Sequence, residues 1–276
     1  MNQELDALIQ RMCGACAQDL TRYDPAFLAQ SLERRVAATG GGSAAAYLAR
    51  LAEDRAEAVA FYRSLSISYS EFFRTPLTFA LLEALLLPGI AAERTRTGRP
   101  EIRVWSAGCA GGHEPYSLAI LLAELAAPHR IFASDIAEAE LAAARQGVYG
   151  EAALRNVPLR HLRGCFEPHG GGFAIRPRLR DAVDFSRHDL LDPRATCPPA
   201  SIFGDFDLIF CCNVLIYYRP DVRRLILDKL RCCLAPGGYL ATSEAERAMV
   251  EQAGGFAPLI PLAAVFQKTG TSVRVR

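Results

Sequence analysis

Residues 102–117 read IRVWSAGCAGGHEPYS, and this stretch decides the fold. Its first four residues have the apolar content of a short strand, and residues 106–112 form a turn of small residues. A helix start follows, with Pro115 in its first turn. Glycine accepts torsions and close contacts that other residues do not, so this turn can bring the main chain close to a ligand above the sheet edge. We therefore expect a strand–turn–helix unit that binds a nucleotide or nucleoside.

Two acidic residues near the turn bear on the kind of ligand. Asp135 ends the next apolar run, where a carboxylate commonly accepts hydrogen bonds from a ribose. Glu114 stands beside the turn, where it would repel a pyrophosphate but pair with the ammonium group of a methionine moiety. The turn also lacks the G-x-G-x-x-G pattern of dinucleotide-binding proteins. These features favour S-adenosylmethionine over NAD, although Glu114 alone is better explained as a carboxylate that stabilises the helix dipole.

The chain from residue 101 onward alternates between strand-like and helix-like segments. Strands are expected at 102–105, 130–134, 207–211, 238–242 and 264–267, and helices at 114–126, 137–146 and 221–234. Residues 148–183 interrupt this order with many Gly, Pro and Arg residues, which is typical of an insertion carrying a small β unit. Because strands alternate with helices, we predict an α/β fold with a mainly parallel sheet and helices on both faces.

The first 65 or so residues show helical spacing and no strand signal. Helices are expected to begin near residues 24, 43 and 55, and another to run over 77–87 until Pro88 and Gly89 end it. The predicted domains are therefore a helical N-terminal domain at 1–68 and a larger domain at 69–276, which contains the insertion at 148–183.

Composition excludes several functional classes. The chain has 276 residues, 51% of them apolar and 22% charged, and a formal net charge of +1. Such a balance creates no overall field that would draw the protein to nucleic acid or to a membrane surface. We find no run approaching the roughly 20 apolar residues of a membrane span, and no signal peptide. The expected location is the cytoplasm, without membrane insertion and without a nucleic-acid partner.

The nine cysteines are an odd number, and several lie in apolar runs, which indicates free thiols in a reducing compartment. Cys13 and Cys16 form a C-x-x-C pair without a second pair or a nearby histidine, so we expect two helix-packing cysteines rather than a redox pair or half a zinc site. No metal site is predicted. Four histidines show no ligand spacing and are expected on the surface or in turns: His129, His161, His169 and His188.

Five ordered segments resemble the CheR-type chemotaxis-receptor methyltransferases, and the match runs from about residue 5 to the end. The segments are SYSEFFR at 68–74, the turn region at 104–117, FASDI at 132–136, FDLIFCCNVLIYY at 206–218 and PGGYLATSE at 236–244. Five matches in one order identify the family far more strongly than any one of them. The resemblance implies a Rossmann-like class I S-adenosylmethionine methyltransferase sheet, with a small all-α N-terminal domain and a small inserted β-subdomain.

The resemblance also implies roles for individual residues. Glu114 would hold the methionine ammonium and Asp135 the ribose, while Asp189 and the backbone of Leu190 would bind the adenine. The residues implied to surround S-adenosylmethionine, or the product S-adenosylhomocysteine, are Ser68, Ser70, Arg74, Glu114, Asp135, Asp189, Leu190, Cys212 and Asn213.

The implied reaction is methyl esterification of glutamate side chains on the cytoplasmic domain of methyl-accepting chemotaxis receptors, catalysed by a monomer. Arg74 and Tyr217 would be the catalytic residues, beside the methyl group and the substrate. Arg74 can place a carboxylate by a bidentate contact. A carboxylate with a free pKa of about 4.3 is already ionised at neutral pH, so no general base is required. The insertion resembles a subdomain that in some family members grips a receptor's C-terminal peptide.

Several departures from the family pattern keep alternatives open. Cys212 stands where arginine is usual, His113 replaces a glutamate, and Asp189 replaces an asparagine. Residues 32–38 are also less basic than the family helix that contacts receptors. The first alternative is a methyltransferase on the same scaffold that acts on another protein or a small molecule. The second is a non-catalytic module that senses the cofactor, which the retention of Arg74 and the other site residues disfavours.

Overall fold

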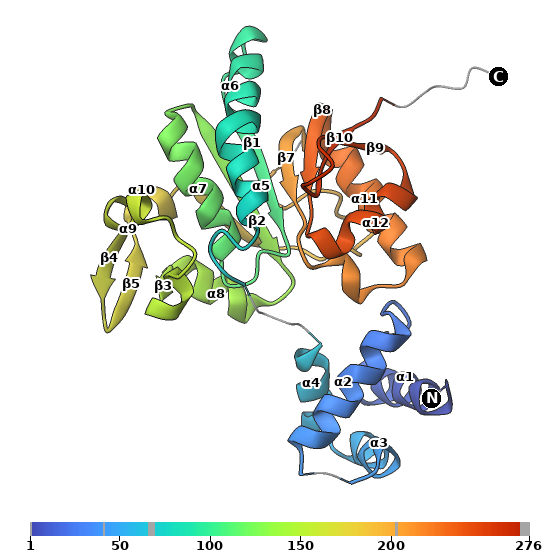
Figure 1. Ribbon diagram of the computed structural model, residues 1–276. Helices are drawn as coiled ribbons and strands as arrows, with labels where there is room; N and C mark the ends of the chain where they lie inside the picture. The colour runs from blue at the N-terminus through green and yellow to red at the C-terminus, as the bar shows by residue number, and fades with distance from the viewer. Residues whose placement is uncertain (1, 41, 66–69, 202–203, 271–276) are drawn as a thin grey trace, which may run out of the picture. The chain divides into compact units, whose positions relative to one another are not determined.

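The computed structural model describes residues 2–40, 42–65, 70–201 and 204–270 (Figure 1). It divides the chain into two compact units, each with its own apolar core. The first unit holds Met1–Ile67 together with Ile216–Arg223, and the second holds Ser68–Leu215 together with Arg224–Arg276. The first unit therefore includes a short segment from the second half of the chain that the sequence alone does not connect with it.

Residues 2–64 of the first unit fold into the helices α1 (Asn2–Cys16), α2 (Pro25–Ala38), α3 (Ala44–Glu53) and α4 (Arg55–Ser64). Three of these helices begin at a polar cap, because the first N–H groups of a helix need acceptors outside it. The side chains of Asp24, Ser43 and Asp54 each accept a hydrogen bond from a backbone N–H two or three residues later. The helix starts predicted near residues 24, 43 and 55 are confirmed.

The core of the first unit contains one buried acidic side chain. Glu57 accepts hydrogen bonds of 2.7 and 3.0 Å from Arg35 and one of 2.7 Å from the hydroxyl of Tyr47. The hydrogen bonds from Arg35, with those from Tyr47, hold the pKa of the Glu57 carboxyl below its usual value. Glu57 therefore links α2, α3 and α4 around apolar residues such as Leu8 and Met12, which are fully buried.

The second unit is built on a seven-stranded sheet in the order β6-β2-β1-β7-β8-β10-β9. Five strands run parallel, and β10 and β9 are antiparallel additions at one edge. The strands are β1 (Ile102–Ala107), β2 (His129–Asp135), β6 (Val183–Arg187), β7 (Phe206–Phe210), β8 (Leu234–Ala241), β9 (Phe256–Pro258) and β10 (Val265–Lys268). The predicted α/β fold with a mainly parallel sheet is confirmed, although β6 and β9 were not predicted as separate strands.

Helices flank this sheet and lie between its strands along the chain (Figure 1). They are α7 (His113–Leu125), α8 (Glu138–Gln146), α11 (Pro220–Cys233) and α12 (Arg247–Ala253), with short 3-10 turns at η3 (Leu215–Tyr217) and η4 (Glu244–Glu246). Both α7 and α8 pack against β2 and β6. The strand β1 crosses the core, where Val104 and Trp105 have no exposed surface.

A small second sheet interrupts the alternation, as the composition of this region predicted. It has the order β3-β5-β4, with β3 (Val148–Tyr149), β4 (Phe166–His169) and β5 (Gly172–Ile175) all antiparallel. Three short helices accompany it, namely η2 (Glu151–Leu154), α9 (Leu159–Cys165) and α10 (Pro177–Arg180). Its apolar residues join the core of the large sheet, because Phe166 and Ile175 belong to the same buried cluster as the main strands.

The helix that precedes β1 is longer than predicted. α5 (Pro76–Leu81) continues through a π-helical turn, η1 (Leu82–Leu86), into α6 (Leu87–Arg96). The expected stop at Pro88 and Gly89 is wrong. In the wider turn the N–H of Leu87 bonds to the carbonyl of Leu82, which lets the helix pass a proline that has no N–H of its own.

This long helix also meets the length and hydropathy requirements of a membrane span, which the sequence analysis did not predict. By composition, Pro76–Arg96 is apolar enough to cross a bilayer. Its residues Phe79, Leu82 and Leu86 are nevertheless buried in the core cluster of the second unit. The apolar side of the helix is therefore used for packing inside the protein.

Two of the histidines expected on the surface or in turns, His161 and His188, are buried. His161 lies on α9 and its ring stacks on Phe73 with centroids 5.7 Å apart. His188 follows β6 and meets the ring of Trp105 edge-on at 5.7 Å. Cys13 was expected to pack against other helices, and this prediction is wrong because the residue is exposed. The ring contacts that bury the two histidines come from residues distant in the sequence, which local spacing does not reveal.

Candidate functional site

Five parallel strands end at one edge of the large sheet, and six of the predicted ligand-binding residues lie there. The central strand β1 has β2 and β6 on one side and β7 and β8 on the other. The chain therefore passes from β6 to the opposite side of β1, and such a switch point is where open α/β sheets bind ligands. The predicted residues at or just after the strand ends are Glu114, Asp135, Asp189, Leu190, Cys212 and Asn213.

Backbone hydrogen bonds hold the turn after β1 against the end of β2. The N–H groups of Gly108 and Cys109 donate to the carbonyl of Ser134 at 2.8 and 3.0 Å. The N–H of Ala110 donates to Oδ2 of Asp135 at 2.9 Å. The turn after β1 therefore lies against Asp135, the carboxylate predicted to bind the ribose.

The same turn also touches the loop that follows β7. Gly108 has a φ of +77°, and a Cβ at this position would lie 2.5 Å from Cγ2 of Val214. A side chain at residue 108 would clash and would be held in the left-handed region, so only glycine fits there. The close approach explains why a glycine directly follows the strand where the site begins.

Glu114 lies in the first turn of α7 and its side chain is partly buried beside the end of β1. The Ser106 hydroxyl donates a hydrogen bond of 2.7 Å to Oε1 of Glu114. The Cys212 thiol lies near the same carboxylate, and its hydrogen bond, of 3.9 Å, goes to the carbonyl of Ala241. Burial raises the pKa of Glu114 to about 7, while the hydrogen bond from Ser106 and the nearby charge of Arg74 oppose this rise. A carboxylate that burial makes costly to ionise gains from a cation, so these residues fit the ammonium group of a methionine moiety.

Asp135 is the last residue of β2 and is partly buried. Its Oδ2 accepts the N–H of Ala110 and its Oδ1 accepts the N–H of Ala137, each at 2.9 Å. Because a carboxylate oxygen can accept more than one hydrogen bond, Asp135 is fixed in place and retains capacity for ribose hydroxyls.

Asp189 and Leu190 follow β6 in a turn, and both are partly buried. Oδ1 of Asp189 accepts the N–H of Leu191 at 2.8 Å, and its carbonyl accepts the N–H of Asp192 at 3.0 Å. The turn holds these residues just beyond the end of a strand that neighbours β2.

One carboxylate that the sequence analysis did not single out organises the loop after β7. Glu246 has no exposed surface and accepts the N–H groups of Asn213, Val214 and Leu215 at 2.7 to 2.8 Å. It also accepts the N–H of Ser243 at 3.0 Å and its hydroxyl at 2.7 Å. These bonds hold Asn213 at a φ of +59°. The Ser-x-x-Glu pattern at 243–246 is a capping box, and it is the sequence signal that could have identified Glu246.

The segment that carries Arg74 is fixed by the two phenylalanines before it. Phe72 is fully buried, with its ring centroid 4.9 Å from that of Tyr149. Phe73 has a φ of +51°, and its N–H donates to the Ser117 hydroxyl at 3.0 Å. A bulky residue rarely adopts this backbone conformation, so the tertiary contacts impose it. They aim the next residue, Arg74, which is exposed.

The remaining predicted residues lie elsewhere or outside the described part. Ser70 is described and partly buried, whereas Ser68 lies outside the described residues. Tyr217 belongs to the first compact unit, where its ring lies 4.8 Å from that of Phe27 and its carbonyl accepts the N–H of Asp24 at 2.9 Å.

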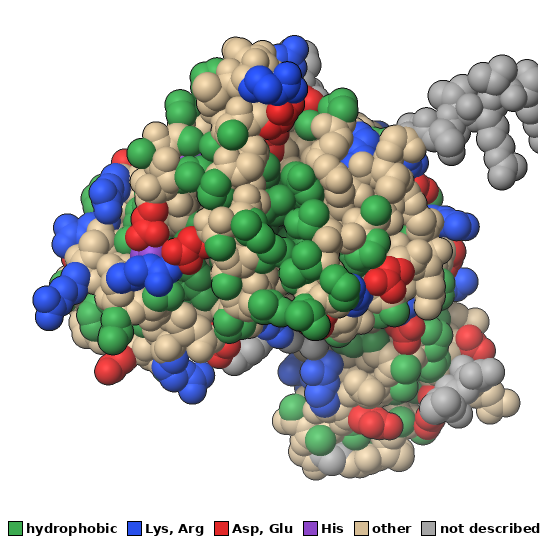
Figure 2. Space-filling view, turned by 45° about the horizontal axis from the view of Figure 1, so that its top comes forward, with side chains coloured by type: hydrophobic (Ala, Val, Ile, Leu, Met, Phe, Trp, Pro, Cys, Tyr) green, Lys and Arg blue, Asp and Glu red, His purple; other side chains and the backbone are tan. Residues whose placement is uncertain are grey.

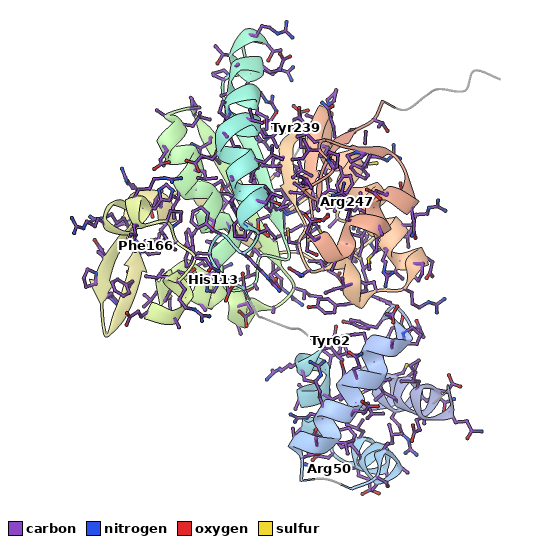
Figure 3. The ribbon with its side chains drawn as sticks, viewed as in Figure 1. Arg50, Tyr62, His113, Phe166, Tyr239 and Arg247 are labelled. Carbon is purple, nitrogen blue, oxygen red and sulfur yellow. The ribbon has the colours of Figure 1, made fainter. Side chains whose placement is uncertain are left out.

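His113 begins α7 (Figure 3) and stands next to Glu114. Its ring centroid lies 4.6 Å from that of Tyr149 and 5.1 Å from that of Phe72. Burial lowers the pKa of His113 to about 4, so the side chain is neutral at pH 7. This residue therefore packs beside the site without adding a charge to it.

Arginine side chains surround the small sheet, and Figure 2 shows basic side chains along the side where Figure 1 places it. Arg160 pairs with Glu83 at 2.6 Å, and Arg155 pairs with Glu71 at 3.4 Å. Three further arginines, Arg176, Arg178 and Arg180, lie in the same region, on and before α10. Among the described residues, no group of three or more His, Cys, Asp or Glu side chains could hold a metal ion.

The fold and the strand-end site define a nucleoside-binding protein of the Rossmann-like α/β class. The family model described as CheR methyltransferase, SAM binding domain, matches residues 68–258. The chain belongs to this family.

Curated relatives agree with the family. The chemotaxis protein methyltransferase of Salmonella typhimurium is 34% identical over 255 residues, which cover 87% of this chain and 84% of that protein. Chemotaxis protein methyltransferase 1 of Pseudomonas aeruginosa is 35% identical over 185 residues, covering 63% of this chain and 64% of that protein. An uncharacterized 104.1 kDa protein in the hypE 3' region of Rhodobacter capsulatus is 32% identical over 243 residues, which cover 86% of this chain. The match spans only 24% of that longer protein.

Proposed function

We propose that this chain is an S-adenosylmethionine-dependent protein-glutamate O-methyltransferase that forms methyl esters on glutamate side chains of chemotaxis receptors. Membership of the CheR family supports this proposal, as do relatives named chemotaxis protein methyltransferase. One observation carries it. The partly buried carboxylate of Glu114 accepts a hydrogen bond from Ser106 at the switch point of the sheet, and its raised pKa makes it a partner for a cationic ligand.

In this proposal the strand ends hold S-adenosylmethionine through several groups. Glu114 pairs with the ammonium, Asp135 accepts hydrogen bonds from the ribose, and Asp189 with the backbone of Leu190 binds the adenine. The residues proposed to complete the surroundings are Ser68, Ser70, Arg74, Cys212 and Asn213.

When bound, S-adenosylmethionine supplies an electrophilic methyl group on a positively charged sulfur. The acceptor glutamate is ionised at neutral pH, because its free pKa is about 4.3, so the chain need not remove a proton from it. Arg74 holds the acceptor carboxylate through two parallel hydrogen bonds. Tyr217 hydrogen-bonds the substrate or packs beside it. Orientation of the acceptor and exclusion of water are the contributions that the protein makes to the rate.

Both domains of the chain take part in this proposed activity. The helical domain at 1–68 and the methyltransferase domain at 69–276, with its β-subdomain at 148–183, act together on the cytoplasmic domain of a methyl-accepting receptor. The protein works in the cytoplasm as a monomer.

Transfer of a tritiated methyl group tests the proposal. The purified chain is incubated with labelled S-adenosylmethionine and with membranes that carry chemoreceptors, and the labelled proteins are then treated with alkali. Label on the receptor that alkali releases as methanol is the expected result, because methyl esters are base-labile. Label on another protein or on a small molecule would overturn the choice of substrate. Tight cofactor binding without any transfer would instead identify a sensing module.

A further inference from the structure

Two cysteines meet at the amino-terminal edge of the large sheet, the edge opposite the proposed ligand site. Cys197 lies in the segment between β6 and β7, and Cys233 is the last residue of α11. Cys233 directly precedes Leu234, which pairs with Phe206 at the start of β7. The two Sγ atoms are 3.1 Å apart, although 36 positions separate the residues in the sequence. A covalent bond between them, of about 2.0 Å, requires only a small approach.

The surroundings of this pair are positively charged and open on one side. Cys197 is partly exposed, whereas Cys233 is buried. The ammonium of Lys229 donates to the carbonyls of Asp192 and Ala195 at 2.7 and 3.0 Å, which holds the segment around Cys197 against α11. Partly exposed thiols in positive surroundings are the reactive ones, because the thiolate is the nucleophile.

The two thiols differ in their readiness to ionise. The hydrogen bond between the two thiols, together with the charges of Arg103 and Lys229, lowers the pKa of Cys197 to about 7 in spite of burial. The same hydrogen bond, and then burial, raise the pKa of Cys233. Cys197 is therefore the thiol that is nucleophilic at neutral pH, and Cys233 stands next to it as the resolving thiol.

We propose that Cys197 and Cys233 form a redox modification site, which a small disulfide such as oxidised glutathione converts into an intramolecular disulfide. The thiolate of Cys197 attacks one sulfur of oxidised glutathione and releases one glutathione thiolate. The Cys233 thiol then loses its proton and attacks the Cys197 sulfur of the mixed disulfide, which releases the second glutathione. The protein loses two protons and two electrons, and one oxidised glutathione becomes two reduced molecules.

The bond would tie the segment between β6 and β7 to α11. This segment starts at the end of β6 and includes Asp189 and Leu190 near its beginning. The inference concerns thiol chemistry at the far edge of the sheet, so it does not depend on the proposed methyl transfer.

Redox titration of the full chain tests the proposal. The protein is equilibrated in buffers with graded ratios of oxidised to reduced glutathione, quenched with N-ethylmaleimide and mapped by peptide mass spectrometry. We expect Cys197 and Cys233 to lose their maleimide labels together and to appear in one cross-linked species, about 2 Da lighter than the dithiol. The peptide links are assigned by fragment-ion sequencing, because Cys232 neighbours Cys233 and two further cysteines, Cys211 and Cys212, lie downstream of Cys197.

Single substitutions provide the matched controls. Cys197→Ser and Cys233→Ser should each abolish the cross-link, whereas Cys232→Ser, at an exposed neighbouring thiol, should retain it. Far-ultraviolet circular dichroism confirms that each variant is folded, and mapping of the unsubstituted chain tests the link without any substitution. The proposal is overturned if both thiols stay labelled in excess oxidised glutathione, if Cys197 stops at the mixed disulfide, or if the link joins other cysteines.

Discussion

The hydroxyl of Ser106 donates a hydrogen bond of 2.7 Å to the carboxylate of Glu114, across the junction between the end of β1 and the start of α7. Burial raises the pKa of this carboxylate to about 7 in spite of that bond. A cationic ligand binds the ionised form, so its binding should release a proton when the pH is below about 7. The proposed role of Glu114 can therefore be tested through the pH dependence of ligand binding.

The affinity for S-adenosylhomocysteine should depend on pH through Glu114. With its pKa at about 7 the carboxyl is mostly protonated at pH 6 and mostly ionised at pH 8. The dissociation constant should then be roughly tenfold larger at pH 6 than at pH 8, as linkage requires. Calorimetric titrations over this range measure the effect. Glu114→Gln should weaken binding at pH 8 and remove the pH dependence, whereas Glu151→Gln, at an exposed residue, should leave both unchanged. An affinity independent of pH in the unsubstituted chain would refute the role of Glu114.

Gly108→Ala should damage both stability and ligand binding. The added methyl group would meet Cγ2 of Val214 at 2.5 Å, and the residue would have to keep a φ of +77°. The left-handed conformation alone costs about 1–2 kcal/mol for a residue with a Cβ. Urea unfolding should show a loss of at least this size. Gly150→Ala is the control, since that site has a φ of −72° and open space around the position of the Cβ. Equal stability of the two variants would show that the close approach has no energetic role.

Glu246→Gln should destabilise the loop after β7 more than it changes the rest of the fold. The carboxylate accepts hydrogen bonds from three consecutive N–H groups starting at Asn213, and an amide oxygen cannot replace both carboxylate oxygens. We expect the free energy of unfolding to fall by about 2–4 kcal/mol. Glu251→Gln removes only an exposed ion pair with Arg247 and should cost less than about 1 kcal/mol. Chemical denaturation compares the two, and a similar loss in both would argue against an organising role for Glu246.

Arg74→Ala should abolish methyl transfer while largely sparing the affinity for the cofactor. The side chain is exposed at the end of a segment held by Phe73, and we assign it to the acceptor carboxylate. Arg74→Lys should restore little activity, because a lysine cannot make the bidentate contact. Initial rates of receptor methylation and calorimetric affinities separate the two effects. Arg99→Ala, at another exposed arginine, should behave as the unsubstituted chain. Full activity of Arg74→Ala would remove this residue from the catalytic set.

Local sequence patterns predicted the helix starts and the main strands, because interactions between residues close in the chain determine them. The helix starts at Asp24 and Ser43 follow from side-chain caps, and the strand–turn–helix unit at 102–117 follows from its apolar run and its glycines. The positions of Glu114 and Asp135 at neighbouring strand ends follow from the parallel order of the strands. These features depend on residues that are close together in the chain.

The features that escaped prediction depend on contacts between distant residues. The burial of His161 comes from stacking on Phe73, which lies 88 positions earlier (161 − 73). The helix continues past Pro88 because a π-helical turn precedes it and accommodates a residue without a backbone N–H. The bonds of Glu246 to the loop after β7 join residues about 30 positions apart, as in the case of Asn213, at a separation of 33. The spacing of residues within a short segment cannot predict contacts with such distant partners.

Titration calorimetry of the purified chain with S-adenosylhomocysteine at pH 8 tests the central claim most directly. We predict saturable binding of one ligand per chain, with an affinity that Glu114→Gln reduces by at least about tenfold. Absence of saturable binding by the unsubstituted chain, in a preparation shown to be folded, would contradict the account.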